Sequence, residues 1–219
     1  MLTLLLKDEM RHLLRTRVAL YGLALPLLGV LGAWIQSASL MQMLLFMGIN
    51  LGGMITGCLV AVSLVTELQA GSPVLFAVRP IPRAWPPLAR FLAMVLLLVS
   101  MQVVSLTLLA AIAPFAGEGI PHLGALVRNA FTLGTSLALL SGAMGFLSGV
   151  LAGSPLTAVL AVFFLSTNAN NIFLFGHQKL AERWHAGASL DAVTLLAAML
   201  ISGPMVAIAV RIYTRKALR

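Results

Sequence analysis

Apolar residues form six long runs along the chain, and the short segments between them hold most of the charged residues and prolines. An α-helix needs about 20 apolar residues to cross the hydrocarbon core of a bilayer. The runs therefore predict an all-α membrane protein with six transmembrane helices, at about 18–35, 40–65, 91–115, 129–152, 156–175 and 188–212. No domain boundary or repeat interrupts them, so residues 1–219 are expected to form a single transmembrane domain.

The first 17 residues differ from these runs because their charges alternate with apolar positions at helical spacing. One side collects apolar residues and the other collects charged ones, respectively Leu5, Leu6, Met10, Leu13 and Leu14, and Lys7, Asp8, Arg11 and Arg15. This pattern predicts an amphipathic helix at 1–17 that lies in the membrane interface with its basic side toward lipid headgroups.

Composition supports a membrane protein, because 60% of the residues are hydrophobic and only 9% are charged. Soluble domains carry about 25% charged residues. The net charge of +8 would favour nucleic acid in a soluble chain. Here the basic residues lie outside the apolar runs, so they indicate contacts with lipid headgroups, and nucleic acid is not an expected partner.

The basic residues also predict the orientation, since cytoplasmic segments of membrane proteins are enriched in Lys and Arg. Eleven fall on one predicted side, namely Lys7, Arg11, Arg15, Arg17, Arg79, Arg83, Arg90, Arg211, Arg215, Lys216 and Arg219. Three fall on the other, namely Arg128, Lys179 and Arg183. We therefore expect a multi-pass protein of the bacterial plasma (inner) membrane, with both termini and the 66–90 loop in the cytosol.

No Asp, Glu, Lys, Arg or His occurs in the middle of a predicted span. Such groups are costly in a bilayer and mark proton relays, voltage sensors and intramembrane active sites. Their absence from the span centres argues against those functions. The single cysteine, Cys58, indicates neither a disulfide nor a metal site. His122, His177 and His185 are expected in outward-facing loops, and no cofactor or metal is predicted.

The uncharged polar residues of the spans have two interpretations. Most are expected to bond between helices. The cluster at 168–171 is denser than packing requires, and it predicts a break in the fifth span or a polar pathway lining formed by Asn50, Asn168, Asn170 and Asn171. Small residues recur every four positions at 48–57 and 141–153, which predicts close helix packing within the chain or, alternatively, a dimer interface.

The loop at 66–90 is the most informative segment. Ser72 followed by Pro73 is a helix start, and Pro80 and Pro82 end the helix. About two apolar turns remain, which are too short to span a membrane and unstable alone in water. Such a short apolar helix must pack into a groove, either between the protein's own spans or on a partner.

This loop resembles that of type-2 ABC exporter permeases. The family carries Glu at the end of the second span, Gly-Ser/Thr four and five residues later, Pro nine residues after that Gly, and Gly-Lys before the third span. The matching positions here are Glu67, Gly71, Ser72, Pro80 and Arg90. Ala89-Arg90 replaces Gly-Lys, Pro73 is unusual, and the first outer loop is very short.

The resemblance implies that the chain is the permease subunit of an ATP-driven exporter. It pairs with a second permease copy or paralogue, as a homo- or heterodimer, and with two cytosolic ATP-binding-cassette subunits. The coupling residues would be Glu67, Gly71, Ser72, Pro73, Leu75, Phe76, Val78, Pro80 and Arg83. The chain has no G-x-x-x-x-G-K-[ST] phosphate loop, so we expect no enzyme activity of its own. Glu67 is expected at the membrane exit, in a surface pair with Arg83, Arg90 or the N-terminal helix, worth about 0–1 kcal/mol.

Three alternatives stay open. The first is that the chain is another small permease of the same superfamily, similar to a haem exporter. A non-transporting, membrane-embedded structural or assembly subunit would have the same composition. An intramembrane enzyme is the third, although no catalytic constellation supports it.

Overall fold

The computed structural model describes residues 2–15, 38–70, 82, 84–112, 123–184 and 188–216, and within these ranges the regular structure is entirely helical. The helices are α1 (Leu2–Arg15), α3 (Ala38–Gln69), α5 (Trp85–Ile112), α6 (Leu123–Leu151), α7 (Pro155–Trp184) and α8 (Ala188–Lys216). Five of them are long and apolar enough to cross a membrane. The predicted first span, 18–35, and the predicted two-turn helix after Ser72 lie outside the described residues.

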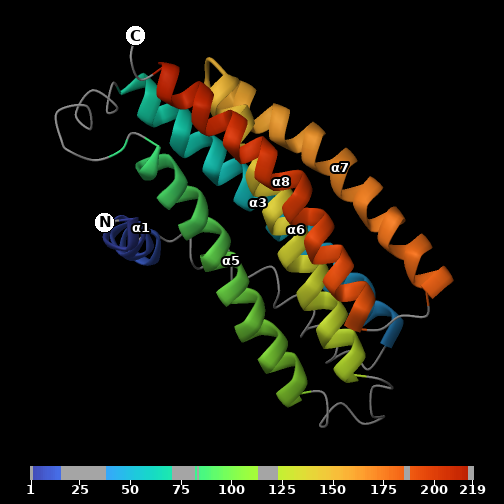
Figure 1. Ribbon diagram of the computed structural model, residues 1–219. Helices are drawn as coiled ribbons and strands as arrows, with labels where there is room; N and C mark the ends of the chain where they lie inside the picture. Colours follow the sequence, from blue (N-terminus) through green and yellow to red (C-terminus); the bar gives the residue numbers. More distant parts are fainter. Residues whose placement is uncertain are drawn as a thin grey trace.

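Helix α1 lies within the predicted N-terminal segment, 1–17, and packs beside α5, while its place in the membrane interface stays a prediction. Figure 1 shows α1 almost end-on while the long helices run across the picture, so α1 crosses the bundle axis steeply. Leu13 is buried, and Leu6 and Met10 pack on the same core cluster as Leu13. Leu14 was grouped with the apolar side by its spacing, but its side chain is exposed.

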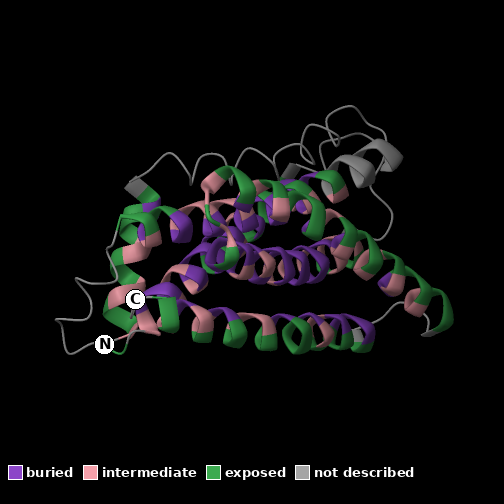
Figure 2. Cartoon of the chain, turned by 90° about the horizontal axis from the view of Figure 1, so that it is seen from above, coloured by how far each residue is buried: buried purple, intermediate pink, exposed green. Residues whose placement is uncertain are grey.

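Helix α6 occupies the centre of the bundle, with 72% of its apolar window buried against 22% for α7. Figure 2 shows buried residues concentrated on the inner helices and exposed residues on the outer ones. The predicted small-residue spacing forms the contact between α3 and α6. A Cβ on Gly57 would lie 2.5 Å from the Ser141 carbonyl oxygen, and one on Gly149 would lie 2.7 Å from that of Ala61. The small residues therefore pack two backbones together within the chain.

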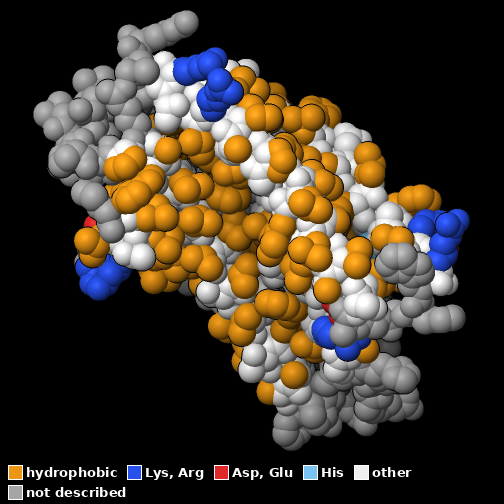
Figure 3. Space-filling model, in the orientation of Figure 1, with side chains coloured by type: hydrophobic (Ala, Val, Ile, Leu, Met, Phe, Trp, Pro, Cys, Tyr) orange, Lys and Arg blue, Asp and Glu red, His pale blue; other side chains and the backbone are white. Residues whose placement is uncertain are grey.

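The basic residues separate toward the two ends of the bundle. Helices α3, α6 and α8 end, and α5 and α7 begin, at what we call the basic end, with Lys7, Arg11, Arg90, Arg211, Arg215 and Lys216. Arg128, Lys179 and Arg183 lie at the opposite end. Figure 3 shows the Lys and Arg side chains toward the ends of the molecule and a broad hydrophobic surface between them. The predicted split of charge is thus present along the bundle axis.

Two helix boundaries differ from the predictions. Helix α5 begins at Trp85, before the predicted span, because Pro86 and Pro87 occupy its first turn, where a missing N–H costs nothing. Helix α7 continues to Trp184 without a break, so the predicted interruption at 168–171 is wrong. A short turn separates α6 from α7, and the Ser154 hydroxyl caps α7 by accepting a hydrogen bond from the Thr157 N–H at 3.2 Å.

Candidate functional site

Four side chains from four helices meet at the basic end in an arrangement that we call the charge cluster: Glu9 of α1, Glu67 of α3, Arg90 of α5 and Tyr213 of α8. The Arg90 guanidinium donates from Nη1 to Glu67 Oε2, and from Nη2 to Glu9 Oε1 at 3.0 Å. The Tyr213 hydroxyl donates to Glu67 Oε1 at 2.8 Å. One guanidinium thus holds two carboxylates, and both oxygens of Glu67 are engaged.

Glu67 and Tyr213 are buried, contrary to the prediction of a surface pair for Glu67, whereas the Arg90 and Glu9 side chains are partly buried, each 21% exposed. Glu67 is 8% exposed and Tyr213 is 2% exposed. Leu64 and the stacked rings of Phe91 and Phe146, with centroids 5.8 Å apart, belong to the surrounding apolar core. Removing one partner of a buried ion pair lowers the stability of a protein by about 3–5 kcal/mol, because the other charge is left buried and unpaired. The estimate for a surface pair therefore does not apply to Glu67.

The positions of these charges along their helices are unfavourable by themselves. Glu67 lies in the last turn of α3, where the helix dipole is negative, and Arg90 lies near the positive start of α5. Arg90 is the sixth residue of α5, beyond the first turn where the dipole acts most strongly, so the dipole cost falls mainly on Glu67, and its pairing with Arg90 offsets that cost. The pair joins the end of α3 to the start of α5 across the segment between them.

That segment carries most of the predicted coupling residues. Gly71, Ser72, Pro73, Leu75, Phe76, Val78, Pro80 and Arg83 lie outside the described residues. On the α3 side, the Gln69 side-chain amide donates to the Gly153 carbonyl oxygen at 2.9 Å. On the α5 side, the Trp85 N–H donates to the Pro82 carbonyl oxygen at 2.9 Å. The α3 side is therefore tied to the turn between α6 and α7, and the α5 side begins with a local turn.

The predicted asparagine group divides into buried and exposed members. Asn170 is fully buried, and its amide donates to Asn50 Oδ1 at 2.9 Å and to the Ser141 hydroxyl at 3.1 Å. Asn168 donates to the Phe164 carbonyl of its own helix at 2.7 Å and, like Asn171, is exposed. Asn50 and Asn170 therefore tie α3, α6 and α7 together. A pathway lined by these four residues stays a prediction.

His177 was expected in a loop but lies within α7, where it is 8% exposed. Its Nδ1 is 2.9 Å from the Thr194 hydroxyl of α8. Phe173, His177 and Leu180 repeat at helical spacing, and this was the signal in the sequence that the helix continues. Near the same end, Arg128 forms an ion pair with Asp191 at 2.6 Å.

Sequence reasoning missed Glu9 and Tyr213. Glu9 is an acidic residue on a basic helix, and Tyr213 is one of only two tyrosines in the chain. Both come from segments far from the 66–90 loop, so no local pattern linked them to it. Among the described residues, no group of three His, Cys, Asp or Glu side chains could hold a metal ion.

A scan against protein-family models finds no match for this chain, and a search of curated proteins finds no similar sequence. The resemblance at the 66–90 loop therefore depends on the loop residues and the helix layout alone.

Proposed function

We propose that the chain is the transmembrane permease subunit of an ATP-driven ABC exporter, working as a permease dimer with cytosolic ATP-binding-cassette subunits. The observation that carries the proposal is the charge cluster. It joins α1, α3, α5 and α8 at the end of the bundle where the predicted coupling segment connects α3 to α5. In this proposal the ATPase activity belongs to the partner subunits and not to this chain.

The cluster supports coupling because it transmits a force applied at one point to four helices. A force on the segment after Gln69 reaches the end of α3 and the start of α5 first. Arg90 links that point to Glu9, and Glu67 links it to Tyr213. Paired charges in an apolar surrounding are costly to separate, so the four helices respond together.

The packing of a single copy supports a pathway between two copies. Helices α3 and α6 meet backbone to backbone at Gly57 and Gly145, which leaves no room for cargo between them. Substrate would instead pass along the faces that two permeases share, with lipid around the remaining apolar surface. The excess of basic residues at one end favours a cytosolic location for that end and for both termini, in a bacterial inner membrane.

Co-purification tests the proposal. The double substitution Leu75→Asp with Phe76→Asp should release a cytosolic protein that carries a phosphate-binding loop and that co-purifies with the unaltered chain. Arg215→Asp, at an exposed position of the same end, changes the net charge equally and serves as the control. The proposal fails if no such ATPase accompanies the unaltered chain, or if the double variant retains it at full stoichiometry while staying folded.

The tight centre also suits a membrane-embedded structural subunit that transports nothing. The backbone contact of α3 with α6 favours a rigid scaffold as much as a gate. The two functions differ in one measurement. In a scaffold, the double variant would leave the ATPase activity of the assembled complex unchanged.

A further inference from the structure

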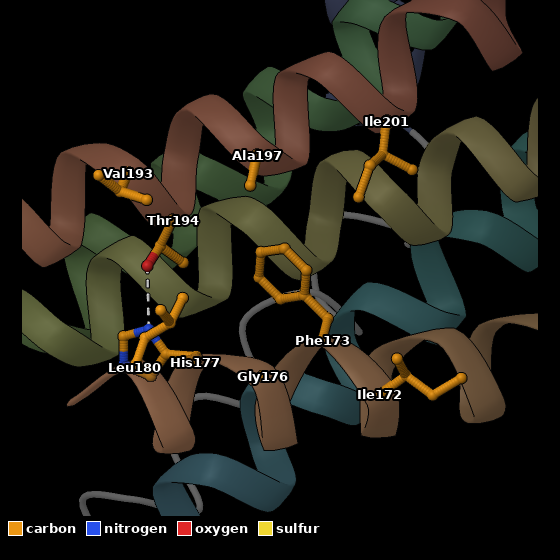
Figure 4. Close-up of a pocket in the computed structure, with 9 residues that line it drawn as sticks. All are labelled: Ile172, Phe173, Gly176, His177, Leu180, Val193, Thr194, Ala197 and Ile201. Carbon is orange, nitrogen blue, oxygen red and sulfur yellow. Dashed lines mark hydrogen bonds between the residues drawn. The ribbon is translucent and has the colours of Figure 1, made fainter. Parts of the chain in front are cut away.

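A cavity of about 240 Å³ lies between α7 and α8, near the end of the bundle opposite to the charge cluster. Phe173, Gly176, His177 and Leu180 line it from α7, and Thr194 and Ala197 line it from α8. Figure 4 shows these side chains between the two helices, with the His177–Thr194 hydrogen bond near one end. A Cβ on Gly176 would meet no atom within 4 Å, so the space beside this glycine is open.

The cavity offers little to water. The Thr194 hydroxyl donates its proton to the Leu190 carbonyl oxygen at 2.7 Å, so it must accept the bond from His177 Nδ1. Both atoms of this bond are therefore used, which leaves Nε2 of the His177 ring as an acceptor for water. A buried water needs two to four polar partners, and apolar cavities of about 150 Å³ stay dry and bind benzene. The cavity thus favours a hydrocarbon occupant.

The position of the cavity identifies the source of that hydrocarbon. Both walls belong to helices long and apolar enough to cross a membrane. The lining also includes Ile172, Val193 and Ile201, which are 73%, 37% and 48% exposed. Exposed aliphatic side chains in a membrane-spanning helix face lipid tails, so the cavity opens sideways to the bilayer.

A basic residue lies where a headgroup would be. Arg183 follows Gly176 by seven residues, which places it on the same face of α7 about 10 Å closer to the bundle end. Lys179 pairs with Glu182 and Arg128 pairs with Asp191. Within the described part of the chain, Arg183 forms no ion pair. We propose that this cavity binds one acyl chain of an anionic phospholipid whose phosphate contacts Arg183.

Photo-crosslinking in nanodiscs tests the proposal, with a phosphatidylglycerol that carries a diazirine in the upper half of one chain. Labelling should concentrate on peptides that contain Phe173–Leu180 and Thr194–Ala197. Ala197→Leu and Gly176→Leu each fill the cavity and should remove most of that labelling. Ala207→Leu is the matched control, because Ala207 is exposed on the same helix and does not line the cavity.

Arg183→Gln tests the headgroup separately. It should reduce the preference of this label for phosphatidylglycerol over phosphatidylcholine by about fivefold, the contribution of one basic residue near anionic lipid. Labelling spread evenly over all lipid-facing helices, or unchanged by both filling substitutions, would overturn the acyl-chain site. An unchanged lipid preference in Arg183→Gln would overturn the contact with phosphate. Neither result depends on transport or on an ATPase.

Discussion

Gly145→Ala tests whether the contact between α3 and α6 holds the bundle together. A Cβ on Gly145 would lie 2.6 Å from the Cα of Gly57 on the facing helix. Carbon atoms in favourable contact are about 3.5–4.0 Å apart. The methyl group has only backbone in front of it, so no side chain can turn away, and the two helices must separate by about an ångström.

The expected cost follows from this separation. Adding a methyl group to a packed core costs about 1–3 kcal/mol. Alanine also favours a helix interior over glycine by about 1 kcal/mol, which hides part of that cost. Gly176→Ala provides the control, because it gains the same propensity within α7 and its Cβ meets no atom within 4 Å. Gly145→Ala should therefore be less stable than Gly176→Ala by about 1–3 kcal/mol.

The measurement is reversible unfolding in mixed micelles, with a denaturing detergent titrated against a mild one. Circular dichroism follows helix content, and the fluorescence of the three tryptophans follows packing. The unaltered chain supplies the reference. Equal free energies of unfolding for the two variants would show that α3 and α6 are not in backbone contact, and the central position of α6 would have to be abandoned.

Three further predictions use the same unfolding assay. Arg90→Gln should destabilise the chain by about 3–5 kcal/mol, because it leaves the buried carboxylate of Glu67 without its cationic partner; stability within 1 kcal/mol of the unaltered chain would contradict this. Asn170→Ala should cost about 1–3 kcal/mol by leaving buried polar partners unpaired, whereas Asn171→Ala, at an exposed position, should change stability by less than about 0.5 kcal/mol. Ser154→Ala should cost about 1 kcal/mol through the lost cap of α7, and an unchanged midpoint would count against the observed capping bond.

The described transmembrane helices could be predicted because lipid imposes a minimum length of apolar helix. Their ends could not, because a helix continues past the hydrocarbon wherever its polar residues still pack. Helix α7 continues nine residues beyond the predicted end at Phe175, since His177 is held by Thr194 of α8. Helix α5 starts six residues before Phe91, because prolines that break a helix interior are tolerated in its first turn.

The site was predictable only in its local part. The resemblance of the 66–90 loop to a known family singles out Glu67 and Arg90, and the N-terminal helix is among the partners expected for Glu67. It could not show that Glu67 is buried, because burial depends on Tyr213, which lies 146 residues away in sequence. The pair of Glu67 and Arg90, which the loop alone predicts as a surface contact, therefore links four helices because α1 and α8 pack against it.

These contacts also indicate which parts of one copy can move against each other. The interface between α3 and α6 resists sliding, because its glycines bring the two helix backbones into direct contact. The charge cluster adds α1, α5 and α8 to the same unit at the basic end. Helix α7 is the least buried, and a cavity separates part of it from α8. If the chain transports, we therefore expect motion as a rigid body of the whole copy, or a displacement of α7, rather than a rearrangement inside the α3–α6 pair.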